Sequence, residues 1–310
     1  MTTMTPQSGT ALAPAAYGTM QWGGTADASA ARDMFAQCLD AGLNHFDTAH
    51  LYTEGRSEEM LGALAGTRDD IFVATKAAYD KPATAANLQA SVDLSRKRLQ
   101  RDVIDLLYLH RFDPTTPLED TFAALAALQQ AGTIRYIGVS NYAAWQVMKA
   151  QAIAAGLGTR IDALQPMMNL VKRQVEVELL PMAADQDIQV CGYSPLGGGL
   201  LTGKYAVTGA DGRLAFDHRY AARYGQAWMH DAAVGLAEIA AGLGVPAATL
   251  AVAWMRRHAP QAHPILSARS AEQLAPSLAG MDYALDDATY AAITALSPTP
   301  PPATDRIEEA

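Results

Sequence analysis

The sequence has few cysteines and no excess of basic charge. Its 310 residues include only Cys38 and Cys191. Two cysteines make no disulfide framework in a chain of this length and are typical of a reducing compartment. Asp and Glu outnumber Lys and Arg by 32 to 23, which gives a formal net charge of −9. This balance argues against general binding to nucleic acid or to anionic membranes, because both need clustered basic side chains.

Long apolar runs are also missing. No run approaches the roughly 18 residues that a membrane span needs, and residues 1–18 lack the basic start and apolar core of a signal peptide. Half of the residues are hydrophobic and 18% are charged, a composition that permits a large folded core. We therefore expect a cytoplasmic protein that binds neither nucleic acid nor membranes.

Short apolar runs alternate with helical stretches along the whole chain. The runs predict strands at residues 14–19, 44–48, 71–76, 103–110, 136–140, 162–165, 188–194 and 264–267. Ala- and Leu-rich segments with helical spacing lie between them, at residues 31–41, 84–99, 117–131, 143–155 and 246–257. Such alternation is typical of βαβ units around a parallel sheet, and unbroken apolar runs suit strands buried on both faces.

Eight such units predict a (β/α)8 barrel in the α/β class. A chain of this length is compatible with one barrel, so we expect a single domain over residues 1–310. Residues 1–16 form an N-terminal segment, and the proline-rich residues 297–310 form a C-terminal tail. A glycine-rich and basic connection, residues 197–226, follows the seventh predicted strand.

Nearly every predicted strand ends in a polar residue. The second, third and fourth strands end at Asp47, Lys76 and His110, and Tyr52 follows Asp47 just before an acidic loop, residues 53–59. Later strands end at Ser140-Asn141, at Gln165, at Tyr193-Ser194 and before Arg269. The carboxyl ends of barrel strands form the active site, so this ring of polar residues predicts one.

The four residue types at strands two to four fit proton transfer to a carbonyl. A tyrosine hydroxyl has a pKa of about 10, and a nearby Lys76 ammonium would lower it. Asp47 would keep Lys76 charged, and His110 could orient a substrate oxygen or share the proton with Tyr52. Together they make a tuned acid beside a site that polarises a carbonyl. Reduction there would require a separate hydride carrier.

Each of these residues also has a simpler explanation. An Asp after a strand is commonly a helix cap or a turn residue, a lone His is commonly a hydrogen-bonded core residue, and Lys76 alone could lie on the surface. His45, Asp47 and His50, with His110, raise the alternative of a metal-dependent hydrolase, because His45 and Asp47 share one strand face. Only His110 among further His or carboxylate residues ends a neighbouring strand, so we expect no metal.

Several long stretches resemble the aldo-keto reductase family, over residues 17–285. They include GLNHFDTAHLYTEGRSEEMLG, IFVATK, LLYLHRFDP, YSPLGGGLLTGKY and PILSARSAEQL. The resemblance implies a (β/α)8 barrel that uses NADPH without a Rossmann domain. It implies a tetrad of Asp47, Tyr52, Lys76 and His110, in which Tyr52 donates the proton. Hydride would pass between C4 of the nicotinamide and the carbonyl carbon of an aldehyde, ketone or sugar-like substrate.

The resemblance also implies a set of cofactor-binding residues. Ser140, Asn141 and Gln165 would hold the carboxamide and Tyr193 would stack on the nicotinamide ring. Ser194, Leu196, Gly198 and Lys204 would belong to the loop over the pyrophosphate. The remaining expected cofactor contacts are Met20 and Asp47 near the ring, and Ser267, Arg269, Ser270, Gln273 and Ser277 at the adenosine 2′-phosphate.

The adenosine end has physical support of its own. Residues 270–273 form a capping-box pattern, which predicts the start of a helix. A helix N-terminus beside Arg269 suits a phosphate, which favours NADPH over NADH. The family usually has glycine at Ser267 and asparagine at Ser277, and Pro276 is expected to kink or end the helix. These departures concern cofactor affinity rather than the reaction.

The loops at the same face supply candidate substrate contacts. We expect them from Trp22, Tyr79, His110, Arg111 and Phe112, whose rings suit an apolar, ring-bearing or sugar-like carbonyl compound. The sequence does not name the substrate. An alternative function is a non-catalytic sensor or channel-associated subunit, because proteins similar to the family bind the nicotinamide cofactor and regulate ion channels. Tyr52 and Lys76 are compatible with both functions.

Overall fold

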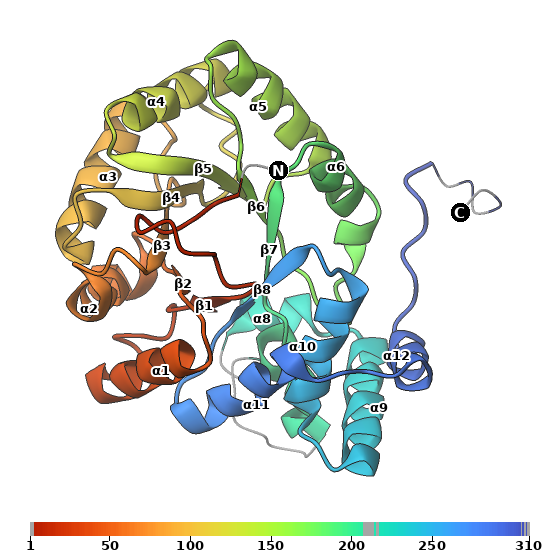
Figure 1. Cartoon of the computed structure of the whole chain (residues 1–310). Helices are drawn as coiled ribbons and strands as arrows, with labels where there is room; N and C mark the ends of the chain where they lie inside the picture. The colour runs from red at the N-terminus through yellow and green to blue at the C-terminus, as the bar shows by residue number, and fades with distance from the viewer. Residues whose placement is uncertain (1–2, 207–213, 215–216, 305, 307, 309–310) are drawn as a thin grey trace.

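The computed structural model is a closed barrel of eight parallel strands (Figure 1). It describes residues 3–206, 214, 217–304, 306 and 308, so parts of the connection 197–226 and of the tail 297–310 lie outside the described residues. Each strand pairs with the next along the chain, and β8 pairs with β1, as Ala16 opposite Ile265, to complete the ring. The predicted barrel is confirmed. The strands are β1 (Ala16–Gly18), β2 (His45–Asp47), β3 (Phe72–Ala77), β4 (Ile104–Leu109), β5 (Ile134–Ser140), β6 (Ala163–Gln165), β7 (Gln189–Tyr193) and β8 (Ala262–Leu266).

Helices surround the barrel, and the five segments predicted as helical are all helices. The acidic segment 53–59 was wrongly predicted as a loop, because α2 begins at Arg56. Its N-cap is Gly55, which offers no capping side chain and therefore no sequence signal for a helix start. The helices are α1 (Ala28–Asp40), α2 (Arg56–Ala65), α3 (Ala85–Leu99), α4 (Leu118–Gln130), α5 (Ala144–Gly156), α6 (Leu179–Asp185), α8 (His218–Arg223), α9 (Ala227–Leu243), α10 (Ala247–His258), α11 (Ala271–Asp282) and α12 (Asp287–Thr294), with 3₁₀ turns η1 (Tyr52–Gly55), η2 (Gln174–Glu176), η3 (Gly197–Thr202) and η4 (Lys204–Ala206).

Polar caps explain where several helices begin. Asp27 accepts a hydrogen bond from the Ala30 amide at α1, and Ser270 accepts one from the Gln273 amide at 3.3 Å at α11. The helix predicted from the capping-box pattern is therefore confirmed. Pro276 does not end it: α11 continues to Asp282, and the Pro276 carbonyl accepts a hydrogen bond from Thr249 Oγ1 at 2.9 Å.

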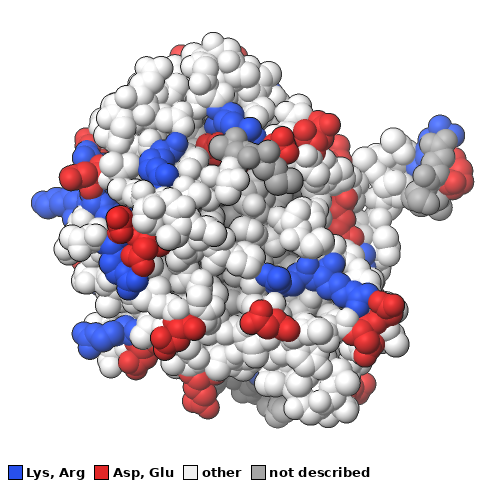
Figure 2. Space-filling model, in the orientation of Figure 1, with Lys and Arg blue, Asp and Glu red and all other residues white. Residues whose placement is uncertain are grey.

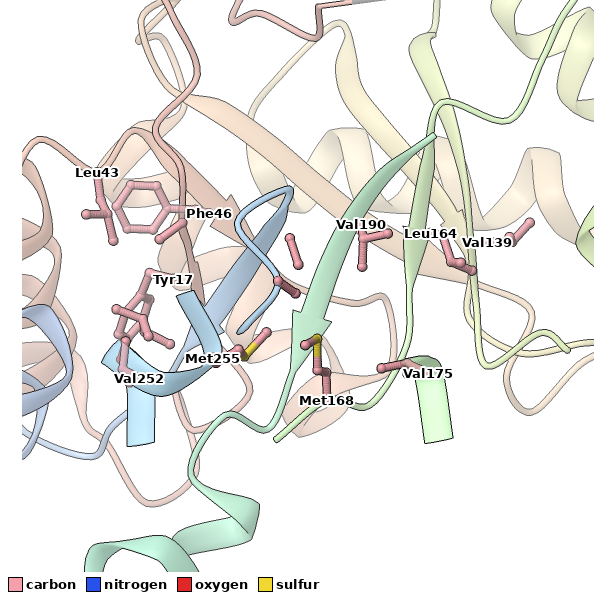
Figure 3. Close-up of a cluster of buried hydrophobic side chains, with 14 of the residues drawn as sticks. Tyr17, Leu43, Phe46, Val139, Leu164, Met168, Val175, Val190, Val252 and Met255 are labelled. Carbon is pink, nitrogen blue, oxygen red and sulfur yellow. The ribbon is translucent and has the colours of Figure 1, made fainter. Parts of the chain in front are cut away.

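Side chains alternate between the two faces of each strand. Tyr17, Phe46 and Val190 point outward and pack, with apolar residues such as Val252 and Met255 of α10, in the layer between strands and helices (Figure 3). Inward-facing side chains form separate buried clusters, one of which contains Phe72, Leu106 and Tyr108. Burial of the apolar layer is the main favourable contribution to the fold and fixes which strand residues face the barrel axis.

The N-terminal segment closes the amino end of the barrel. Met4 is buried against inward-facing side chains that include Phe72 and Leu106. Arg135 donates a hydrogen bond from Nη1 to the Thr5 carbonyl at 2.6 Å, which fastens the segment. At the other end of the chain, residues 298–304 lead away from the barrel beyond α12 (Figure 1). The carboxyl end of the barrel is thus the end left to bind a ligand.

Charges on the face shown in Figure 2 lie in separate groups, and most basic side chains have acidic ones beside them. Among the described residues, no single helix is long and apolar enough to cross a membrane. Helices α9 and α10 meet that length and composition only when taken together, and they are bent by 103° where they join.

Candidate active site

A buried ion pair lies at the carboxyl end of the barrel. Lys76 Nζ contacts Asp47 Oδ1 and donates a second hydrogen bond to the Thr48 carbonyl at 2.7 Å. The other oxygen of Asp47 accepts a hydrogen bond from Gln165 Nε2 at 2.8 Å. Burial lowers the pKa of Lys76, and Asp47 opposes that shift. The two residues are 1% and 3% exposed, so their charges interact with little solvent screening.

Tyr52 is placed over this pair by the loop that follows β2. The loop continues the backbone pairing with β3, because the Thr48 amide donates to the Ala74 carbonyl and the His50 amide to the Lys76 carbonyl. Tyr52 then opens η1, and the Lys76 ammonium lies 5.1 Å from the centroid of its ring. At this distance the ammonium makes a cation–π contact with the ring of Tyr52.

His110 completes the group that the sequence predicted. It lies just beyond β4, with its ring edge-on to the Tyr52 ring at a centroid separation of 5.7 Å. Burial, with the charges of Lys76 and Arg111, lowers the pKa of His110 to about 3, so the ring is neutral near pH 7. No described residue hydrogen-bonds its buried Nδ1 atom. A neutral imidazole can donate a hydrogen bond to a ligand oxygen without carrying charge.

The residues expected at the nicotinamide already bond one another. Ser140 Oγ donates to the Gln165 carbonyl at 2.8 Å, and Asn141 Nδ2 donates to the His110 carbonyl at 2.9 Å. Tyr193 Oη donates to Asn141 Oδ1 at 2.7 Å. Asn141 adopts a left-handed backbone, with φ of 58°, which turns its amide back over the strand end. The structure therefore brings this predicted group together at one edge of the barrel mouth.

The expected pyrophosphate loop is built on glycine. Gly198 and Gly199, in η3, have φ of 66° and 98°, values that L side chains rarely adopt. A Cβ on Gly199 would lie 3.2 Å from Lys204 Nζ, so the missing side chain lets this ammonium lie close to the backbone. Ser194 and Leu196 immediately precede η3, and both are partly buried. This loop offers a cation beside a bare backbone, which suits an anionic ligand.

The expected adenosine end lies at the start of α11. Arg269, Gln273 and Ser267 are exposed there, and the Arg269 amide donates to Gln273 Oε1 at 3.4 Å. Ser267 lies beyond β8, which ends at Leu266 rather than at the predicted residue 267. Ser277, in contrast to these three exposed residues, is buried within α11 and is only 1% exposed.

One expected substrate contact is wrong. Trp22 is fully buried, and its Nε1 donates to Tyr17 Oη at 3.2 Å in the layer outside the barrel, so its ring presents no surface to a ligand. Met20, two residues earlier, is 38% exposed. The sequence shows only that an aromatic residue follows β1 and not which way its ring turns.

The other expected substrate contacts form two aromatic groups. Tyr79 is 38% exposed, 4.9 Å from the His110 ring, and carries the Arg111 guanidinium over its face at 4.9 Å. Phe112 instead packs against Tyr142 and against Trp145, which is 64% exposed. Trp145 was not among the predicted contacts, although it is also an aromatic residue close to a strand end.

The alternative prediction was a metal site built on histidine and carboxylate side chains. Among the described residues, no three His, Cys, Asp or Glu side chains are grouped so as to hold a metal ion. His45 faces the barrel interior without a hydrogen-bond partner among the described residues, and burial lowers its pKa to about 3. His50 lies in the loop above β3, and its carbonyl contacts Arg98.

Comparison with known proteins agrees with this geometry. The sequence pattern of the aldo/keto reductase family matches residues 15–298. The chain is 36% identical over 300 residues to aflatoxin B1 aldehyde reductase member 2 of Mus musculus, with coverage of 89% of this chain and 82% of that protein. It is 33% identical over 298 residues to a probable voltage-gated potassium channel subunit beta of Oryza sativa subsp. japonica, with coverage of 89% of each chain.

A solved structure is also similar. The glycerol dehydrogenase AKR11B4 from Gluconobacter oxydans superposes with a TM-score of 0.80 at 26% sequence identity, covering 96% of this chain and 95% of that one. The family pattern spans nearly the whole barrel, and the relatives match along most of their own length. The chain therefore belongs to the aldo/keto reductase family, whose members are oxidoreductases of carbonyl substrates.

Proposed function

We propose that this protein is an NADP(H)-dependent oxidoreductase that interconverts a carbonyl and an alcohol, with Tyr52 as the proton donor. The observation that carries the proposal is the position of the Lys76 ammonium. It is held by the buried Asp47 carboxylate and lies 5.1 Å from the Tyr52 ring, beside a neutral His110. This arrangement supports a phenol tuned to give up a proton where a carbonyl oxygen can be held.

The residues around the mouth fit a nicotinamide dinucleotide. Donors and acceptors of Ser140 and Asn141 suit a carboxamide, and the exposed Arg269 at the N-terminus of α11 suits a 2′-phosphate. The left-handed glycines of η3, with Lys204 beside them, suit a pyrophosphate. The bound cofactor would supply the hydride for the carbonyl carbon.

The chain's own residues have separate roles in this reaction. Tyr52 gives its hydroxyl proton to the substrate oxygen as that oxygen gains negative charge. Lys76 stabilises the resulting tyrosinate, and Asp47 keeps Lys76 protonated in spite of its burial. His110, being neutral, donates a hydrogen bond to the same oxygen and so orients the carbonyl.

The substrate class follows from the rings beside His110. Tyr79 offers an aromatic ring that is 38% exposed, and Arg111 adds a cation over its face. These side chains suit an aldehyde, ketone or sugar-like compound with an apolar or ring-bearing part. The names of two similar proteins, an aflatoxin B1 aldehyde reductase and a glycerol dehydrogenase, support carbonyl and alcohol substrates.

A second function is a nicotinamide-binding sensor or channel-associated subunit. The likeness to proteins named as potassium channel beta subunits, in Oryza sativa and Arabidopsis thaliana, favours it over other non-catalytic functions. The two functions differ in turnover. A sensor would bind NADPH and reduce no member of a broad carbonyl panel at a useful rate.

The test compares wild type with Tyr52→Phe. NADPH consumption over an aldehyde and ketone panel should fall about 10²- to 10⁴-fold in the variant, the range that general acid catalysis supplies. Quenching of protein fluorescence by NADPH should show that binding is retained. A variant that reduces the panel as fast as wild type would show that Tyr52 is not the proton donor.

A further inference from the structure

The backbone directly after Tyr52 follows an unusual path. Thr53, Glu54 and Gly55 all have positive φ, of 48°, 61° and 96°. Residues with a Cβ seldom adopt this region, and two in succession need support from their surroundings. Thr53 receives part of that support, because its Oγ1 donates to the Trp22 carbonyl at 2.8 Å and accepts from the Ser57 amide at 3.0 Å.

An arginine from another helix supplies further contacts. Arg98, in the last turn of α3, donates from Nη1 to the His50 carbonyl at 3.0 Å and from Nη2 to the Glu54 carbonyl at 3.5 Å. One guanidinium thus joins the backbone on both sides of Tyr52. It lies flat against Gly55, where an added Cβ would overlap its central carbon. Position 55 therefore requires glycine for two reasons: its φ is positive, and a Cβ there would overlap the Arg98 guanidinium.

The guanidinium is itself fixed to the barrel. Glu58, fully buried in the first turn of α2, accepts from Arg98 Nη1 at 3.3 Å. Its other oxygen accepts from Thr75 Oγ1 at 2.7 Å. Thr75 precedes Lys76 in β3, so the contacts run from the strand that carries Lys76 to the loop that carries Tyr52. The Glu58 side chain is fully buried and that of Arg98 is 18% exposed, so the guanidinium has a fixed partner on the barrel side.

We infer that Arg98 is a positioning residue, which sets the distance between the Tyr52 hydroxyl and Lys76 by holding the carbonyls of His50 and Glu54. This inference rests on the proposed role of Tyr52 as proton donor. The side chain of Arg98 donates to the carbonyls of His50 and Glu54 and to Glu58, so we expect it to act through the loop that carries Tyr52. The guanidinium donates to both carbonyls from two different nitrogens, which the single nitrogen of a lysine ammonium cannot do.

The test uses two matched substitutions in one helix. Arg98→Lys keeps the charge beside Glu58 but cannot reach both carbonyls, and we expect kcat to fall about 10- to 100-fold, as misplacement by about 1 Å can cause. KM and the NADPH dissociation constant should stay unchanged. Arg96→Lys alters the next arginine on α3, whose partners are Asp93 and Asp102, and should leave kcat as in wild type. If Arg98→Lys does not fold, the double variant Arg98→Met with Glu58→Gln takes its place. It removes both charges of the pair at once and puts neutral side chains of similar length there, so no charge is left without a partner. The same loss of kcat is expected.

Two readouts separate positioning from simple loss of structure. Amide exchange in residues 48–57 should be faster in Arg98→Lys and unchanged in Arg96→Lys. In a Tyr52→Phe background, Arg98→Lys should lower the residual kcat no further, because its effect passes through the phenol. An equal loss in both backgrounds, or unchanged exchange in residues 48–57, would overturn the inference.

Failure of the proposed function would look different. A wild-type protein that binds NADPH but reduces no carbonyl would overturn the proposed function and, with it, the role of Arg98 in proton donation. Faster exchange in Arg98→Lys alone, together with unchanged kcat in a fully active enzyme, would overturn only the inference about Arg98.

Discussion

Replacing Lys76 with methionine should destabilise the protein strongly, and a second substitution should reverse most of the effect. Methionine has similar length but no donor, so Asp47 Oδ1 and the Thr48 carbonyl lose their partner while both stay buried. The Lys76 and Asp47 side chains are 1% and 4% exposed, so water does not replace the lost bonds. Leaving one half of a buried ion pair typically costs about 3–5 kcal/mol.

Asp47→Asn in the same chain removes the charge that was left unpaired. The amide can still accept the hydrogen bond from Gln165 Nε2 that Asp47 accepts. The double variant should therefore recover about 2–4 kcal/mol relative to Lys76→Met alone, since a neutral replacement of a buried pair is often close to neutral for stability. Both variants should lack carbonyl reduction, because the ammonium beside Tyr52 is gone.

Urea unfolding at pH 7, followed by circular dichroism, measures these differences as changes in the free energy of unfolding. The reasoning would be refuted by a double variant no more stable than Lys76→Met.

Three further predictions concern the cofactor, the histidine and the barrel interior. Arg269→Ala should weaken NADPH binding about 10-fold or more and NADH binding far less, because only NADPH loses a charge-assisted hydrogen bond. Equal weakening of both cofactors in fluorescence titrations would show that Arg269 does not bind the 2′-phosphate. Because the pKa of His110 is about 3, its ring stays neutral and kcat/KM for reduction should show no step from it between about pH 5 and 7; a step that disappears in His110→Gln would contradict this. Gly138→Ala should lower the free energy of unfolding in urea by about 1–3 kcal/mol, because the new Cβ would lie 2.5 Å from Cε1 of the buried Tyr108 ring. Adding Tyr108→Leu should restore part of this loss. If the double variant is no more stable than Gly138→Ala, the proposed overlap is contradicted.

The barrel and the catalytic group could be predicted because their signals are local. IFVATK and its counterparts are continuous apolar runs, and each ends in a polar residue at the strand end where barrel sites form. The meeting of Asp47, Lys76 and His110 then follows from the order of neighbouring strands. Strand ends moved by one or two residues, as at Ala77, since the apolar pattern does not show where backbone pairing stops.

Other features could not be predicted because they depend on distant contacts. Gln165 reaches Asp47 across the barrel, although the two lie 118 positions apart in the sequence. The helix at Arg56 begins after a left-handed glycine instead of a polar cap, and the ring of Trp22 turns away from the mouth. The contacts of Arg98 with the Tyr52 loop could not be read from the sequence. A basic residue near a helix C-terminus is common, because it interacts favourably with the helix dipole.

Closure of the barrel also bears on how the chain folds as it is synthesised. Seven of the strand pairings join neighbours in sequence, and only the pairing of β1 with β8 joins the two ends of the barrel sequence. Until β8 emerges, one side of β1 has no partner, and an unpaired strand edge invites aggregation. β1 has only three residues, Ala16 to Gly18, so the edge that stays open longest is also among the shortest in the barrel. A short edge offers few hydrogen bonds to a wrong partner, which limits misassembly of nascent chains.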